Sequence, residues 1–150
     1  MADNFLERRM EEMKRGKLLG RRHSYSAGKR VLVLCGDPDM TGKLVKRLRG
    51  EGWSVAFAGT DPDFGRSLSQ ASGSQFHPID ICDFSDLERS LRLLWRVWRG
   101  VDLILMSVPD GWGEEDYRER VDSAVAKVRS AQPVVCDAVT SLEIVSSYDE

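Results

Sequence analysis

The chain has 150 residues, which is the size of one ordinary domain. Hydrophobic residues make up 41% of it and charged residues 31%, a balance that suits a packed core inside a polar surface. No apolar run approaches the roughly 20 residues that a membrane span requires, and the charged N-terminus has no apolar signal core. We therefore expect a cytoplasmic protein with no membrane partner.

Charge is unevenly distributed along the chain. Residues 1–30 hold nine Lys and Arg against four Asp and Glu, a net charge of +5. The remaining residues hold 13 against 20, a net charge of −7. We divide the chain into a basic arm and linker at 1–28 and a domain at 29–150. Apolar spacing within the arm predicts a short amphipathic helix over residues 4–14.

The cysteines and histidines point to no special chemistry. Cys35, Cys82 and Cys136 are odd in number, widely spaced and form no C-x-x-C pair. Reduced thiols in a cytosolic protein fit this pattern. With only two histidines besides, we expect no metal site.

From residue 29 onward, strand and helix patterns alternate. Continuous apolar runs such as "RVLVLC" (30–35) are typical of strands buried on both faces of a parallel sheet. Apolar residues that recur every three or four positions indicate helices. The predicted elements are a strand at 30–35, a helix at 43–52, a strand at 53–59, a helix at 61–72, a strand at 74–80, a helix from 85 or 86 to 99, a strand at 101–108, a helix at 114–130, a short helix from 133 to about 141, and a fifth strand at 142–147.

This alternation, with connections of a few residues, predicts the topology. Right-handed crossovers between parallel strands require a doubly wound parallel sheet. We predict an α/β fold with about five strands in the order 3-2-1-4-5. The apolar stripes around Trp95/Trp98 and Val121/Val128 fit either the core face of their helices or a surface for another copy of the chain.

Residues 29 to about 110 resemble the N-terminal half of the short-chain dehydrogenases/reductases (SDR), a family with the Rossmann fold. The resemblance rests on the order of several features. It covers the turn in "VLVLCGDPDMTG" (31–42), the second strand in "EGWSVAFAG" (51–59), the third strand and next helix in "FHPIDICDFSDLERSL" (76–91), and "WRGVDLILMSV" (98–108), where the family has its Asn-Asn-Ala-Gly motif. It implies a Rossmann-like domain related to NAD(P) binding.

The glycine-rich turn departs from the family pattern. The family has T-G-x3-G-x-G, and Cys35, Gly36, Met40, Thr41 and Gly42 fall on its T, first G, second G, x and third G. The middle glycine lets the backbone approach the pyrophosphate. Met40 places a long side chain there, so we expect the approach to be obstructed.

Electrostatics gives the same expectation. The N-terminus of a helix attracts anions, but Asp37 and Asp39 stand at this one. We expect Asp39 to cap the helix in a self-capped Asp-Pro-Asp turn. Unit like charges about 5 Å apart repel by about 3 kcal/mol at an effective dielectric near 20, which corresponds to roughly a hundredfold loss of pyrophosphate affinity.

The remaining cofactor positions match only in part. Gly59 falls where NAD-binding members carry the acid that binds the ribose, and Asp61 lies two residues further on. No Arg or Lys follows to hold the 2′-phosphate of NADP. Asp80 and Ile81 fall where the family contacts adenine. The candidate cofactor-binding residues are therefore Gly36, Asp37, Met40, Thr41, Gly42, Gly59, Asp80 and Ile81.

The family's catalytic positions have no counterpart in the predicted domain. The family carries Tyr and Lys four residues apart on one helix, and the pair with that spacing here, Tyr25 and Lys29, lies before the first predicted strand. Val108 and Pro109 crowd the place where the family keeps small residues. Because hydride transfer needs a general acid, we expect no self-sufficient oxidoreductase and name no catalytic residue.

Three functions stay open at this point. The first is an SDR-like pseudoenzyme with an eroded cofactor site, which binds a protein partner or forms a homo-oligomer. The alternative is genuine NAD(P)(H) binding, as a sensor or as part of a split oxidoreductase. The third places anion binding, or docking onto another copy, in the basic arm. Without an aromatic platform we expect nucleic acid not to be a partner, and we expect no cofactor or weak NAD(P).

Overall fold

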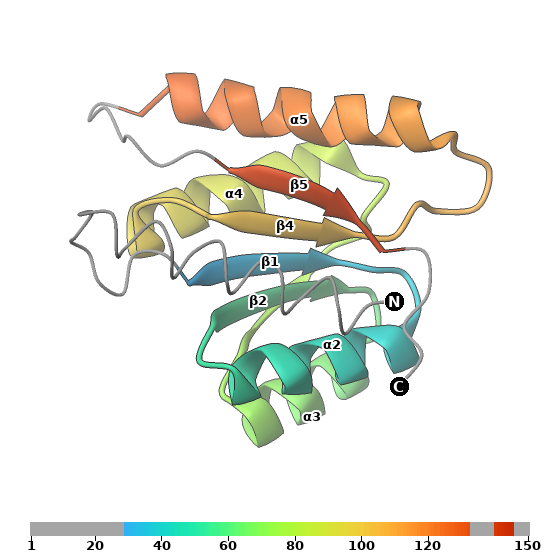
Figure 1. Ribbon diagram of the computed structural model, residues 1–150, viewed down its shortest axis with the longest axis vertical. Helices are drawn as coiled ribbons and strands as arrows, with labels where there is room; N and C mark the ends of the chain where they lie inside the picture. The colour runs from blue at the N-terminus through green and yellow to red at the C-terminus, as the bar shows by residue number, and fades with distance from the viewer. Residues whose placement is uncertain (1–28, 133–139, 146–150) are drawn as a thin grey trace.

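The computed structural model describes residues 29–132 and 140–145. Within them a parallel sheet lies between two pairs of helices (Figure 1). The elements in chain order are β1 (Arg30–Leu34), α2 (Pro38–Gly50), β2 (Ser54–Gly59), α3 (Pro62–Ser72), β3 (Gln75–Pro78), α4 (Phe84–Trp98), β4 (Leu103–Met106), α5 (Glu114–Ser130) and β5 (Ser141–Ile144).

The sheet has the predicted topology. Its strand order is β3-β2-β1-β4-β5, and every neighbouring pair is parallel. Val31 of β1 is in register with Val55 of β2 and with Leu103 of β4. The chain moves outward from β1 in one direction and then returns to add β4 on the other side. The order therefore reverses at β1, which makes the carboxyl end of this strand a topological switch point.

Both faces of the sheet are covered. Leu32 and Leu34 pack on the side of α4 and α5, whereas Val31 and Val33 pack on the side of α2 and α3. Figure 1 shows the two helix pairs on opposite sides of the sheet. Burial on both faces explains why β1 is apolar at every position after Arg30.

The apolar stripes of the two long helices belong to this core. Trp95 is 5% exposed, Val121 is fully buried, and Val128 is 1% exposed. Trp98 is partly buried and packs against the same cluster. These side chains therefore belong to the internal faces of α4 and α5, the first of the two readings that their spacing allowed.

Helix α2 begins five residues before its predicted start. Asp37 is the N-cap, and its side chain accepts a hydrogen bond from the backbone N–H of Asp39 at 3.1 Å. Pro38 fits the first helical position because its φ is fixed and it has no N–H to leave unpaired. The prediction that Asp39 caps the helix is therefore wrong. The same Asp-Pro-Asp tripeptide opens α3, where Asp61 is the cap.

Other boundaries differ by a few residues. Asp83 caps α4, so this helix begins at Phe84 instead of at 85 or 86. Strand β4 occupies only the middle of its predicted range of 101–108. Strand β5 begins at Ser141, where the predicted short helix was to end. Thr140 is described and is not helical, whereas residues 133–139 of that helix and the predicted helix over 4–14 lie outside the described residues.

His77 is a buried polar link between β3 and α4. Its Nδ1 lies 2.9 Å from Ser90 Oγ, and its Nε2 lies 3.3 Å from Gln75 Oε1. Because an amide oxygen only accepts, the neutral ring donates from Nε2 to Gln75 and accepts at Nδ1 from the Ser90 hydroxyl. Burial lowers the pKa of His77 below its ordinary value of 6.5.

This lowered pKa predicts a pH dependence of stability. Between the folded and unfolded pKa values the unfolded chain binds more protons, so the free energy of unfolding rises with pH. The contribution of His77 is fully present above 6.5, its unfolded value, and is lost as pH falls through the folded value. Urea unfolding from about pH 7.5 to about pH 5 should show this slope. His77→Gln should flatten it and His23→Gln should not; equal slopes in both variants would contradict the assignment.

Candidate functional site

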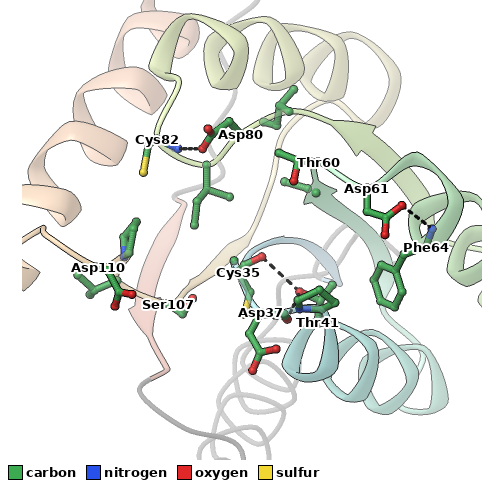
Figure 2. A pocket seen from close by; sticks show the side chains of 18 residues that line it. Cys35, Asp37, Thr41, Thr60, Asp61, Phe64, Asp80, Cys82, Ser107 and Asp110 are labelled. Carbon is green, nitrogen blue, oxygen red and sulfur yellow. Dashed lines mark hydrogen bonds between the residues drawn. The ribbon is translucent and has the colours of Figure 1, made fainter.

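A cavity of about 510 Å³ opens at the carboxyl ends of β1, β2, β3 and β4. It lies where the strand order reverses, which is where open α/β sheets bind ligands. Its volume is within the range of small-molecule sites. Figure 2 shows that its labelled side chains come from the loops that follow the four strands and from the first turns of α2 and α3, which contribute Thr41 and Phe64.

Most of the predicted site residues meet at this cavity. Those that line it are Gly36, Asp37, Thr41, Gly59, Asp80 and Ile81. Met40 and Gly42 are not among the lining residues. Met40 Sδ lies 3.3 Å from Cys35 Sγ, and its side chain packs against the core on the α2 side of the sheet. The structure therefore places this thioether against the core, whereas the sequence predicted that it would obstruct the approach of a pyrophosphate.

The backbone at Gly36 and at Gly42 would accept a residue with a side chain. A Cβ atom at Gly36 would lie 3.7 Å from Ile81 Cδ1, and one at Gly42 would lie 3.9 Å from Phe64 Cζ. Both distances are ordinary van der Waals contacts. At both positions a side chain could therefore be accommodated without a clash.

Four carboxylates surround the cavity. Asp37 accepts a hydrogen bond from Asp39 N at 3.1 Å, Asp61 from Asp63 N at 3.0 Å, and Asp80 from Cys82 N at 2.9 Å. The fourth, Asp110, follows β4. Among the described residues that line this cavity there is no Lys, Arg or His. The site is therefore acidic, and three of its four carboxylates already accept a hydrogen bond from a backbone N–H group.

Several lining residues were not singled out by sequence reasoning. They are Thr60, Cys82 and Asp110, and Asp61 was noted only for its position two residues after Gly59. Each stands a few residues beyond the carboxyl end of a strand. That position is a signal in itself, because parallel strands bring such loops to one edge of the sheet. Val108 and Pro109 line the cavity at the place where crowding was expected.

Tyr117 of α5 holds the loop after β3 in place. The fully buried phenol donates a hydrogen bond to Ile81 O at 2.8 Å. Phe84 and Trp112 pack around it, with ring centroids 5.9 Å and 5.7 Å from its own. Burial raises the pKa of Tyr117 well above its ordinary value. Its proton is therefore engaged within the protein.

The thiol at the cavity edge is not activated. Burial raises the pKa of Cys82, and the charge of Asp80 raises it further. A thiol is nucleophilic only as its thiolate, so this environment works against covalent chemistry. In the stretches 29–132 and 140–145 no three His, Cys, Asp or Glu side chains are grouped so that they could hold a metal. No helix in the same stretches is long and apolar enough to cross a membrane.

The strand order, the two helix layers and the cavity at the switch point define a Rossmann-like α/β fold. No protein-family model matches the chain, and no curated protein matches it. Solved structures do. Saccharopine dehydrogenase (L-Glu forming) from Saccharomyces cerevisiae is 18% identical with a TM-score of 0.53, over 81% of this chain and 22% of that one.

Two short-chain dehydrogenases are similar to the same degree. The enzyme from Bacillus anthracis is 10% identical with a TM-score of 0.55, over 68% of this chain and 50% of that one. A mutant short-chain dehydrogenase/reductase from Serratia marcescens is 20% identical with a TM-score of 0.52, over 67% and 50%. These identities establish the fold alone, and the chain spans only 22% to 50% of the length of these structures.

Proposed function

We propose that this chain is a non-catalytic, SDR-like Rossmann domain with an eroded cofactor site, which acts by binding a protein partner or another copy of itself. The observation that carries the proposal is the chemistry of the cavity. Four carboxylates and no cationic side chain line it, within the described residues. A dinucleotide would bring its negatively charged diphosphate to this place.

In this proposal, phosphate binding is lost at the backbone N–H groups where α2 begins. A helix N-terminus binds phosphate because its first N–H groups are unpaired. At α2 the Asp37 carboxylate takes up this position, so a diphosphate would have to displace it or lie beside it. Tyr117, the tyrosine that the described residues include, donates a hydrogen bond from its hydroxyl to a backbone carbonyl. It is therefore no general acid for hydride transfer.

Calorimetric titration tests the proposal. We expect no heat when NAD⁺, NADH, NADP⁺ or NADPH is added to the full chain at millimolar concentration, and no oxidation of either reduced form. Micromolar binding of any of the four would overturn the proposal.

A charge-neutral variant sharpens this test. Asn caps a helix as well as Asp does, so Asp37→Asn keeps the start of α2 and removes the charge. We expect its affinity for NADH, followed by ligand-observed NMR, to rise about 10- to 100-fold, because the cavity is open to solvent and the full repulsion is screened. Asp63→Asn is the matched control, since that carboxylate is 94% exposed and lies outside the cavity. An equal gain in both variants would mean that Asp37 does not reject the phosphate.

Dinucleotide binding is the second candidate, in a sensor or in one part of a split oxidoreductase. It is favoured by one observation: six of the eight positions implied by the family line a single cavity. If wild-type protein binds a dinucleotide and Asp80→Ala abolishes that binding, this candidate replaces the first.

A further inference from the structure

The solvent face of α4 carries an unusual mixture of side chains. Leu93 is 40% exposed and Val97 is 57% exposed, and they are the exposed large hydrophobic residues of the described chain. Arg89, Arg92 and Arg96 are also exposed. Spacings of three, four, seven and eight residues place all five on one side of the helix. We call these five residues the α4 outer face.

The positive charge of this face is only partly neutralised. Arg89 pairs with Asp86, one turn earlier on the same helix. Glu88 lies 3.9 Å from Arg92 and 3.3 Å from Lys127 of α5, so one carboxylate serves two cations. Among the residues that the structure describes, Arg96 has no ion-pair partner. The face therefore keeps net positive charge beside its two apolar side chains.

A structural role accounts for only part of this pattern. A cation in the last turn of a helix interacts favourably with the helix dipole, which explains Arg96. It does not explain why Leu93 and Val97 stand on the solvent side. Helix α4 already has a complete inner face, since Leu87, Leu91 and Leu94 are fully buried.

The positive charge of the α4 outer face favours some binding partners and disfavours others. A symmetric contact with the same face of another copy would set arginine against arginine. The N-terminal residues 1–30 of this chain carry a net charge of +5, so they too are repelled. Nucleic acid would satisfy the arginines but leave the apolar pair without a partner. Arginine beside apolar side chains is instead the composition of protein interfaces.

We propose that the α4 outer face docks an acidic amphipathic helix of a partner protein, with its apolar residues on Leu93 and Val97 and its carboxylates on the arginines. This inference rests on the proposed function, because it supplies the chemistry of the partner. The two fail separately: dinucleotide binding would overturn the proposed function, whereas the α4 outer face is tested by peptide binding.

The experiment uses the full chain and a synthetic helical peptide of about 20 residues, long enough to be helical. The peptide has leucines at i and i+4 and glutamates at the flanking positions. Two control peptides carry lysine in place of every glutamate, or glutamine in place of every leucine. A single-stranded DNA oligonucleotide and phosphatidylserine vesicles test the other anionic partners.

We expect the acidic peptide to bind, with an affinity that falls as salt is raised, and both control peptides to bind at least about tenfold more weakly. Arg92→Glu with Arg96→Glu should weaken binding by about tenfold or more. Leu93→Gln with Val97→Thr should also weaken it. Lys43→Glu with Lys46→Glu on α2 makes the same charge change on the other side of the sheet, and it should leave binding unchanged. Far-UV circular dichroism checks that every variant is folded.

The contrary outcomes are distinct. No binding of the acidic peptide at millimolar concentration would overturn the inference. So would equal binding of the lysine peptide, or an equal loss in the α2 control variant. Tighter binding of DNA or vesicles than of the peptide would assign the face to phosphate instead of to a protein helix.

Discussion

Replacing Asp102 with alanine is expected to lower the free energy of unfolding by about 3–5 kcal/mol. Asp102 accepts hydrogen bonds from Arg30 Nε at 2.8 Å, from Arg30 Nη2 at 3.0 Å and from the backbone N–H of Arg30 at 3.0 Å. The two side chains are only 16% and 10% exposed. Removing the carboxylate leaves a guanidinium with little access to water and no counter-charge, which costs more than the pair itself contributes.

Urea unfolding measures this effect, and an exposed ion pair supplies its control. Arg66 pairs with Asp63 at 3.2 Å on the surface of α3, with side chains 67% and 94% exposed. Asp63→Ala should cost no more than about 1 kcal/mol. The Arg30–Asp102 pair joins the beginnings of β1 and β4, at the edge of the sheet opposite the cavity. If Asp102→Ala costs no more than Asp63→Ala, the pair does not hold these strands together.

The fold was predictable because its signals are local. Apolar strands, helix periodicity and short connections leave few topologies, and the strand order was confirmed. The start of α2 was placed too late because the buried apolar positions of this helix begin only at Leu44. Its cap was assigned wrongly because two aspartates, Asp37 and Asp39, compete for it. Pro38 decides between them: it cannot donate an N–H, so it takes the first helical position and makes Asp37 the cap. The preference of proline for the first helical position can be read from the sequence, and it would have given the correct start of α2 at Pro38.

The candidate site was predictable to a smaller extent. A family motif points to particular positions, so Asp37 and Asp80 were found, whereas Thr60 and Asp110 were not. The position of Met40 could not be read from the motif. Once α2 begins at Pro38, Met40 lies in its first turn and reaches Cys35, a contact that depends on where the helix starts. The acidity of the cavity is a property of four loops together, which no single motif contains.

Gly65→Ala is the second change for which we expect a large effect, a loss of about 1–3 kcal/mol in the free energy of unfolding. Gly65 lies in α3, and a Cβ atom there would stand 2.3 Å from Cε1 and Cζ of Phe76 on β3. That ring also packs on Phe57, with ring centroids 5.4 Å apart, so any shift of the Phe76 ring to relieve the clash disturbs this second contact. In an open position the same change would stabilise the helix, because alanine is the better helix former.

Two further variants separate overpacking from helix propensity. Gly50→Ala on α2 has no atom within 4 Å of the new Cβ, so we expect no loss and a gain of up to about 1 kcal/mol. In a Phe76→Ala background, the ring is gone and Gly65→Ala should cost nothing further. The double-mutant cycle therefore measures a coupling of about the full single-mutant loss. A cost that persists without the ring would place the strain in the α3 backbone, and the contact between α3 and β3 would not be the reason for glycine at position 65.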